Sequence, residues 1–381
     1  MILVTGSTGL LGGHVVYALL QKQERVAALK RPSAKTETLR EIFSYYTNDP
    51  DQLMERIDWR TGDMLDKESL VQAMAGISGV INCAAIVSFN PRDRGRLIDN
   101  NIEGTRNLAE VLLAKEEDYK TVRREERKTL LIHISSTSAL GDGPGDDPKF
   151  LIDEDTPRDP NRRHTGYSVS KYESEQVLRQ MGLNVVILNP GIILGPGQWG
   201  KGSSQLFVKA WQGLKYYPYG GTGYVDVRDV TGIISEISYR LSVIGYEDSP
   251  SSDLSFLSSS GLKVLQSSST VFQSFNQQRY CLVGANLRYR DFFNLATDEF
   301  GKPNPPIYAG KFLSGLVWRA DTLRARITGR YPLLTRETAE AAQHISFYSA
   351  DKIRKALDYR FRPVEETIEW VTACYRRCVE L

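Results

Sequence analysis

Short apolar runs alternate with stretches of helical periodicity through the first half of the chain. Five runs are rich in Val, Ile or Leu with little polar alternation, as expected for strands buried on both faces of a sheet. These candidate strands are Ile2–Thr5, Val26–Leu29, Gly79–Asn82, Leu130–Ser135 and Asn184–Leu188. The candidate helices between them are Gly9–Gln21, Lys67–Ala75, Asn101–Ala114 and Ser168–Met181. This order predicts an α/β fold, a doubly wound parallel sheet with helices on both faces.

The regular alternation stops after Asn189-Pro190, where the chain becomes rich in glycine. We therefore expect a first domain over residues 1–190, with a returning segment near 224–246. A smaller C-terminal lobe of mixed α/β structure would form from residues 191–223 and 279–381. Residues 247–278 are rich in serine, which is typical of an insertion or a surface loop.

Composition excludes several classes of protein. The chain carries 48 Lys and Arg residues against 46 Asp and Glu, a formal net charge of +2. This balance gives no electrostatic footprint for nucleic acid, and no run approaches the roughly 20 apolar residues of a membrane span. The first apolar run follows Met1 directly and leaves no room for a signal peptide, so we expect a cytoplasmic protein. Cys374 and Cys378 lack a second close pair or a nearby His, so we expect packing thiols and no metal site.

The strongest local signal is a glycine motif between the first strand and the first helix. Its residues are Gly6, Ser7, Thr8, Gly9, Leu10, Leu11 and Gly12. Gly6 would allow a tight turn, Gly9 would let backbone approach a pyrophosphate, and Gly12 would let helix and strand pack closely. The first N–H groups of the helix and its positive dipole end then favour phosphate. The motif therefore predicts a dinucleotide-binding turn.

The end of the second strand indicates which dinucleotide is bound. An NAD site usually has Asp or Glu at that position to bond the ribose 2′-hydroxyl, but here the strand ends in Lys30 and Arg31. A basic pair can neutralise a 2′-phosphate, so we favour NADP(H), with NAD(H) as the alternative. The two residues could also be solvated strand-end charges. Further along, Asp63 could accept from the adenine amino group, and Met64 could pack on the ring.

A phenol and an ammonium lie four residues apart at Tyr167 and Lys171. Residues at this spacing share one face of a helix. The reference pKa of tyrosine, about 10, is too high for ready proton transfer near neutrality, and a neighbouring cation lowers it. Ser136 follows a buried strand, at the sheet edge where ligands of open α/β sheets bind. We favour a catalytic role for Ser136 over capping of the next helix.

Together these residues resemble the extended short-chain dehydrogenase/reductase family, which has a Rossmann fold and includes sugar epimerases, dehydratases and ketone reductases. The landmarks are the glycine motif, Gly62-Asp63, Asn82-Cys83-Ala84-Ala85, Asn101 to Asn107, the Ser136 cluster, Tyr167 with Lys171, Asn189-Pro190-Gly191 and Val225 to Val230. The segment Ala84 to Phe89, the Lys30-Arg31 strand end and Gly220 to Val227 look most like the dihydroflavonol-reductase and 3β-hydroxysteroid-dehydrogenase branch.

The resemblance implies a role for each matching residue. Tyr167 would be the acid/base, Lys171 its pKa tuner and a ribose ligand, and Ser136 the second donor to the substrate oxygen. Asn101 would sit near Lys171 and help position it or a water relay. The nicotinamide end of the cofactor would be lined by Ala84 and Ala85 and approached by Asn189, Pro190, Gly191 and Ile192.

These roles predict hydride transfer between NADP(H) and the carbonyl or secondary alcohol carbon of a small molecule. One alternative is a nucleotide-sugar epimerase or dehydratase, in which NAD is reduced only transiently. Another is a binding protein that senses NADP(H) without turnover, although such a protein has no need of Ser136, Tyr167 and Lys171. The resemblance also suggests a homodimer that associates through the helices at 101–114 and 168–181.

Overall fold

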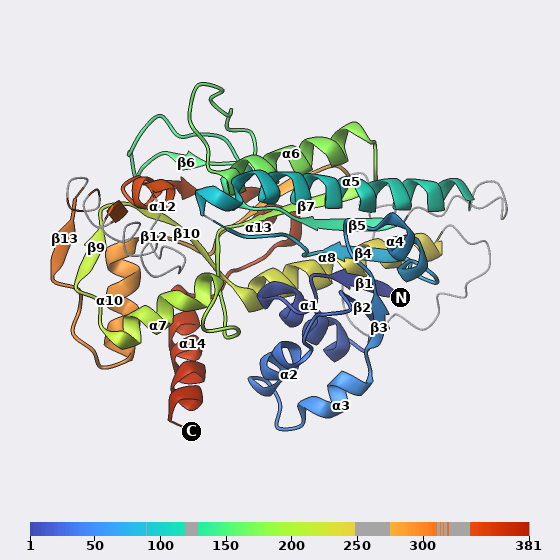
Figure 1. Cartoon of the computed structure of the whole chain (residues 1–381), viewed down its shortest axis with the longest axis horizontal. Helices are drawn as coiled ribbons and strands as arrows, with labels where there is room; N and C mark the ends of the chain where they lie inside the picture. The colour runs from blue at the N-terminus through green and yellow to red at the C-terminus, as the bar shows by residue number, and fades with distance from the viewer. Residues whose placement is uncertain are drawn as a thin grey trace.

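The computed structural model describes residues 1–88, 90–118, 129–247, 275–310 and 336–380, together with residues 313, 315, 318 and 319. Within these ranges, seven parallel strands form one large sheet in the order β11-β7-β5-β4-β1-β2-β3 (Figure 1). Their bounds are β1 Ile2–Thr5, β2 Val26–Lys30, β3 Asp58–Thr61, β4 Gly79–Asn82, β5 Leu130–Ile134, β7 Val185–Pro190 and β11 Arg279–Leu282. The strand order reverses between β1 and β4, which confirms the doubly wound parallel sheet.

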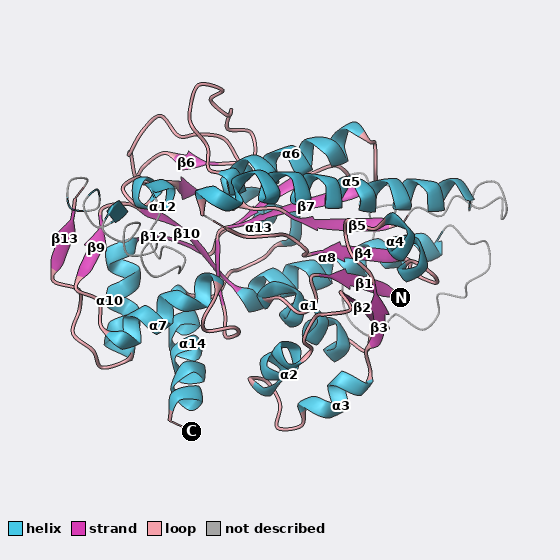
Figure 2. Ribbon diagram, in the orientation of Figure 1, coloured by secondary structure: helices cyan, strands magenta, loops and turns pink. Residues whose placement is uncertain are grey.

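Helices cover both faces of this sheet because successive strand residues point to opposite sides. Val4 lies in one buried cluster with residues of the first face, whereas Leu3 lies in a second cluster on the other face. The helices of the first face are α1 Leu10–Gln21, α2 Glu37–Ser44, α3 Pro50–Glu55, α8 Val227–Glu247 and α13 Asp351–Leu357. Those of the second are α4 Lys67–Ala73, α5 Arg94–Asp118 and α6 Gly166–Gln180 (Figure 2).

The smaller lobe contains short sheets and helices of mixed arrangement. Strands β8 Ile192–Leu194, β10 Gly221–Asp226 and β12 Ala285–Arg288 form one mixed sheet, in which β10 is parallel to β8 and antiparallel to β12. Two parallel pairs join β9 Tyr216–Pro218 to β13 Ile307–Ala309, and β6 Leu151–Ile152 to β14 Phe347–Tyr348. The helices are α7 Gln205–Gln212, α10 Tyr289–Glu299, α12 Arg336–Ala341 and α14 Val364–Val379. Single 3-10 turns lie at Pro91–Asp93, Thr137–Ala139 and Gly202–Ser204.

The position of β11 differs from the expected division of the chain. We expect residues 279–381 in the smaller lobe, but β11 forms the edge strand of the large sheet, parallel to β7. Tyr280, Cys281 and Leu282 are buried there, so this short apolar run completes the core of the first domain. Most of the expected serine-rich insertion, residues 248–274, lies outside the described residues, and Phe275, near its expected end, is buried in the core.

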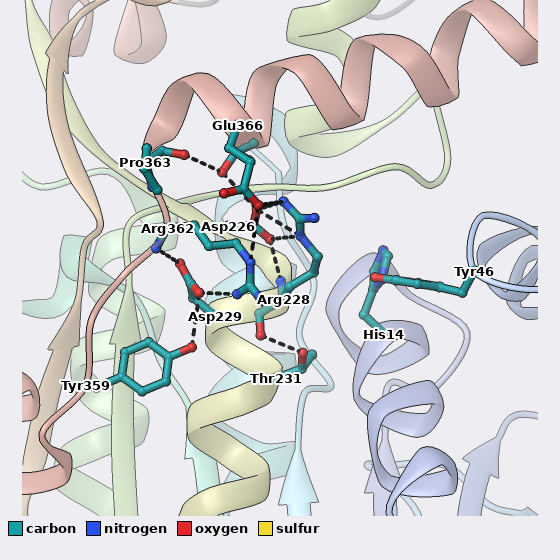
Figure 3. Close-up of polar contacts among 11 residues, drawn as sticks. His14, Tyr46, Asp226, Arg228, Asp229, Thr231, Tyr359, Arg362, Pro363 and Glu366 are labelled. Atoms are coloured by element: carbon teal, nitrogen blue, oxygen red, sulfur yellow. Dashed lines mark hydrogen bonds and ion pairs between the residues drawn. The ribbon is translucent and has the colours of Figure 1, made fainter.

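Buried charges join α8 to the chain segment that leads into α14 (Figure 3). The Asp226 carboxylate accepts hydrogen bonds from the Arg228 guanidinium and from the Thr367 hydroxyl, the latter at 2.8 Å. The Asp229 carboxylate accepts from the Tyr359 hydroxyl at 3.0 Å and from the Arg362 backbone N–H at 2.9 Å. Burial raises the pKa of Asp229. The network fixes the smaller lobe against the start of α8, beside one end of the large sheet.

His14 in α1 provides a test of stability against pH. Its ring Nδ1 lies 2.6 Å from the Tyr46 hydroxyl, and Nε2 lies 2.8 Å from the Pro196 carbonyl oxygen, so the neutral ring can donate to Pro196 and accept from Tyr46. Burial lowers the pKa of His14 to about 4. The unfolded chain therefore binds a proton here from about pH 6.5 downward, before the folded chain does, and the free energy of unfolding falls with pH over this window.

We expect His14 to account for about 3 kcal/mol of stability lost between pH 6.5 and 4. Urea unfolding of the wild type and of His14→Gln, measured from pH 4 to 8, checks this. The variant should lose less stability than the wild type on acidification. If stability falls equally with pH in the two proteins, His14 binds protons equally in the folded and unfolded states and the prediction is wrong.

Candidate active site

The turn between β1 and α1 requires glycine at two of its positions. Gly6 has a positive φ of 61°, and a Cβ there would lie 2.8 Å from the backbone of Cys83 and Ala84. A Cβ on Gly12 would overlap the Gly6 carbonyl oxygen. The absence of side chains therefore lets β1, α1 and the loop after β4 approach one another, as the sequence motif predicts.

The same turn has the features of a phosphate cradle. Gly9 is the N-cap of α1 and provides no side-chain cap, and the first turn of α1 contains no acidic residue. The first N–H groups of the helix have no intrahelical partner and remain available to an anion. Leu11 is buried in the core, and the Ser7 hydroxyl donates to the Leu29 carbonyl at 2.8 Å. These two side chains hold the turn against the body of the domain. The cradle thus fits the pyrophosphate of a dinucleotide.

The candidate adenosine-binding residues lie at or just after the ends of the neighbouring strands β2 and β3. The Lys30 amine lies 6.0 Å from the centroid of the Trp59 ring, and Arg31 after it is exposed. Asp63 and Met64 follow β3, so all four lie at the carboxyl edge of the sheet on the side of β1 expected for adenosine. The Asp63 carboxylate accepts from the Leu65 N–H at 3.0 Å, which fixes its orientation.

Ser136 and Tyr167 come together in the structure although they lie thirty-one positions apart in the chain. Ser136 follows β5, Tyr167 lies in the first turn of α6, and their side chains are hydrogen-bonded. The Ser136 hydroxyl also accepts from the Ser138 N–H at 3.2 Å, so it caps the following 3-10 turn as well. Burial raises the pKa of Tyr167 more than the Ser136 hydrogen bond lowers it, so the net shift is upward, opposite to the lowering that the neighbouring Lys171 leads us to expect.

Lys171 lies one turn further along α6 and is buried. Its amine donates to the Ile134 carbonyl, the last residue of β5, at 2.7 Å. Burial lowers the pKa of Lys171 to about 8, although the nearby Cys83 and Glu175 partly oppose this shift. The lysine is therefore fixed at the same strand end that carries Ser136, with a pKa near the working range of an enzyme.

Asn101 in α5 connects the loop after β4 to α6. Its side chain accepts from the Ile86 N–H at 2.7 Å, donates to the Ile86 carbonyl at 3.0 Å and donates to the Ser170 hydroxyl at 3.1 Å. Asn101 therefore bonds to Ser170, the residue that precedes Lys171 in the chain. In the same loop, the Ala84 N–H donates to the Thr5 hydroxyl at 3.2 Å, and Ala85 is exposed.

Asn189, Pro190, Gly191 and Ile192 form the end of β7 and its passage into β8. The Asn189 amide donates to the Ser136 carbonyl at 3.0 Å, which connects this segment directly to the serine. A Cβ on Gly191 would overlap the Gly223 carbonyl oxygen of β10. Glycine is required here because β10 crosses the segment at close range.

Sequence reasoning misses Glu175, which the structure places next to these residues. Its side chain is fully buried in α6, one turn after Lys171, and it bonds to Ser135 and Asn189. The four-residue spacing of Tyr167, Lys171 and Glu175 could have indicated a shared helix face. A glutamate is usually exposed, however, and its burial follows only from packing against β5, β7 and β11.

Two broader features concern the described ranges only. No group of three His, Cys, Asp or Glu side chains there is arranged to hold a metal ion. Among the described helices, none combines the length and the apolar character needed to cross a membrane. Cys374 is buried, and the Arg377 guanidinium contacts its Sγ at 3.3 Å.

Comparison with known proteins identifies the family. Residues 2–229 match the NAD-dependent epimerase/dehydratase family. The chain is 29% identical over 236 residues to sterol demethylase protein B of Methylococcus capsulatus, covering 61% of this chain and 63% of that protein. It is 28% identical over 242 residues to cinnamoyl-CoA reductase 1 of Petunia hybrida, covering 60% and 66%. The matched part therefore spans less than two thirds of these relatives.

The fold has solved counterparts as well. The crystal structure of gox2253 superposes with a TM-score of 0.72 at 24% identity, covering 99% of this chain and 98% of that one. The family match includes the glycine turn, the Ser136 segment, Tyr167, Lys171 and Asn189. Since it spans more than half of the sequence, the chain belongs to the NAD-dependent epimerase/dehydratase family, within the extended short-chain dehydrogenases/reductases.

Proposed function

We propose that this protein is an NADP(H)-dependent oxidoreductase that interconverts a carbonyl compound and a secondary alcohol. The observation that carries the proposal is the hydrogen-bonded pair of Ser136 and Tyr167, with Lys171 one helical turn away. This group lies at the carboxyl end of β5, on the same sheet edge as the glycine turn after β1. Ligands of open α/β sheets bind at that edge, where the strand order reverses.

The proposed mechanism follows from the chemistry of these side chains. When bound, the dinucleotide donates or accepts a hydride at its nicotinamide ring. In the reductive direction, Tyr167 donates its hydroxyl proton to the substrate oxygen as that oxygen gains negative charge, while Ser136 donates a hydrogen bond to the same oxygen. In the oxidative direction, Tyr167 accepts the proton from the alcohol. A fixed donor aimed at developing charge lowers the activation barrier by on the order of 3 kcal/mol.

Lys171 supports the proton transfer electrostatically. Its protonated amine favours the phenolate that forms when Tyr167 has given up its proton. Because burial lowers the pKa of Lys171 to about 8, the amine is charged at neutral pH and loses its charge in mildly alkaline solution. By resemblance to the family, the same amine would also bind the nicotinamide ribose.

The preference for NADP(H) over NAD(H) depends on Arg31 and Lys30. We expect Arg31→Ala to weaken NADPH binding about tenfold, since it removes a charge-assisted contact to the 2′-phosphate, and to leave NADH binding nearly unchanged. Fluorescence titration with both cofactors checks this. Arg25→Ala is the matched control, because Arg25 is exposed just before the opposite end of β2. Equal weakening of NADPH and NADH binding would contradict the assignment of Arg31.

A second function, nucleotide-sugar epimerase or dehydratase, is favoured by the family match itself. The two functions differ in the fate of the cofactor. A reductase consumes NADPH and releases NADP⁺, whereas an epimerase or dehydratase restores its cofactor within each cycle. A reductase has no need of a binding site for the nucleotide of a sugar substrate.

A thermal-shift comparison followed by turnover assays tests the proposal. A ligand that binds only the folded state raises the melting temperature. We expect the largest rise with NADPH, and NADPH oxidation with ketone or aldehyde substrates. A rise with UDP- or dTDP-sugars, with no net change in cofactor oxidation, would replace this proposal with the epimerase. Binding of NADPH with no turnover of either substrate class would favour the sensing function.

We also propose that the protein is a cytoplasmic homodimer that associates through α5 and α6. The family resemblance leads us to expect this mode of association. The two helices lie side by side on one face of the large sheet (Figure 1). Sedimentation equilibrium distinguishes the dimer from a monomer of 42.9 kDa.

A further inference from the structure

The buried acid Glu175 connects the proposed catalytic residues to the edge of the large sheet. One carboxylate oxygen, Oε1, accepts hydrogen bonds from the Ser135 hydroxyl and, at 2.6 Å, from the Asn189 amide. The other oxygen, Oε2, lies 3.3 Å from the Arg279 guanidinium, which is itself mostly buried. The carboxylate therefore contacts groups from the ends of β5 and β7 and from the start of β11.

Two of these contacts lead to Ser136. Ser135 is its neighbour in the chain, and the amide of Asn189 that donates to Glu175 also donates to the Ser136 carbonyl at 3.0 Å. Glu175 thus holds the backbone of Ser136 from two sides. This backbone sets the position from which the Ser136 hydroxyl bonds to Tyr167.

Glu175 also lies one helical turn from Lys171, and Arg279 lies on its other side. Its negative charge raises the pKa of Lys171 and so opposes the effect of burial. Three other titratable groups lie around the two residues. Burial lowers the pKa of Arg158, and the negative charge of Glu175 is among the groups that oppose this shift. Burial raises the pKa of Cys83 and lowers that of His133, and the positive charge of Lys171 lowers both.

We propose that Glu175 is a positioning residue for the proposed reaction, one that holds the Ser136 backbone and maintains the charge on Lys171, with Arg279 as its counter-ion. The inference rests on the proposed function. The alternative is that the Glu175–Arg279 pair only joins α6 to β11. In that case the pair would affect only stability, because removing either residue leaves the other charge buried and unpaired.

Glu175→Gln separates these roles because the amide keeps the size of the side chain and one acceptor oxygen but removes the charge. At neutral pH we expect kcat to fall about 10- to 100-fold, since small displacements at a reacting centre have effects of this size, with little change in KM for NADPH. The alkaline limb of the kcat profile should move to lower pH by about one unit, because Lys171 loses its neighbouring negative charge.

Arg279→Gln should move the same limb in the opposite direction. It leaves the Glu175 charge without its counter-ion, so the negative charge one helical turn from Lys171 is no longer compensated and Lys171 should hold its proton to higher pH. General loss of stability cannot produce opposite shifts in two variants. Glu116→Gln is the matched control, because Glu116 is a buried helical glutamate that accepts the Thr129 N–H at 3.0 Å and lies outside the proposed site.

The pKa of the Lys171 amine can also be measured without turnover, from the pH dependence of its trace labelling with acetic anhydride. The inference expects the pKa to be lower in Glu175→Gln and higher in Arg279→Gln than in the wild type. The inference would be overturned if the Lys171 pKa were the same in all three proteins, or if Glu116→Gln lowered kcat as much as Glu175→Gln does. If Glu175→Gln does not fold, the direction of the Arg279→Gln shift decides. If no carbonyl substrate turns over, the proposed function fails, and the labelling still determines whether Glu175 controls the charge of Lys171.

Discussion

Tyr167→Phe is expected to lower kcat by about 10²- to 10⁴-fold, the range that a general acid contributes, while binding of NADPH stays within about twofold. The substitution removes only the hydroxyl, so the ring keeps its packing in the first turn of α6. Ser136 loses its hydrogen-bond partner, but it keeps the contact with the Ser138 N–H that fixes its position. The forming alkoxide then has no residue to protonate it.

Steady-state kinetics with a ketone substrate and fluorescence titration of NADPH measure the two effects separately. Tyr172→Phe is the matched control because Tyr172 lies in the same helix, and the Arg158 guanidinium is 4.5 Å from its ring centroid. That contact needs the ring and not the hydroxyl, so the control should keep its activity. Turnover retained by Tyr167→Phe would remove Tyr167 from the acid/base role.

The sequence predicts the central part of the fold because those strands are apolar along their whole length. Each expected strand is found, with ends that differ by two residues at most, as at β7, which runs to Pro190. β11 is not anticipated as part of the large sheet because it follows a serine-rich segment without periodicity, far along the chain from the other strands. Its place beside β7 depends on contacts between residues about ninety positions apart.

The candidate site divides in the same way. Ser136, Tyr167 and Lys171 can be predicted because a helix brings residues four apart onto one face and a strand end exposes the serine. The direction of the Tyr167 pKa shift cannot be predicted from the sequence, since it depends on burial, which outweighs the hydrogen bond with Ser136. Glu175 is missed for a related reason. The structure brings Glu175 into contact with Ser135, Asn189 and Arg279, and no spacing of residues within α6 predicts these contacts.

Gly12→Ala is expected to have the second large effect, on both stability and cofactor binding. A Cβ at this position would overlap the Gly6 carbonyl oxygen and lie 3.0 Å from the Ser7 Cα, both of which are backbone atoms. Since no flexible side chain can move aside, α1 must shift relative to β1. We expect a loss of about 2–3 kcal/mol in the free energy of unfolding, typical of overpacking, and weakening of NADPH binding by about a hundredfold as the helix end moves.

Gly9→Ala is the matched variant that separates these two effects. Gly9 has an ordinary φ of −87°, and the nearest atom to an added Cβ is the Gly6 carbonyl oxygen at 3.2 Å, so the turn has to yield only slightly. Its free energy of unfolding should stay within about 0.5 kcal/mol of the wild type. NADPH binding should still weaken, because the new methyl group would stand where backbone has to approach the pyrophosphate. Urea unfolding without cofactor and NADPH titration, applied to both variants, distinguish the two roles. If Gly9→Ala binds NADPH as the wild type does, the pyrophosphate does not lie at the start of α1.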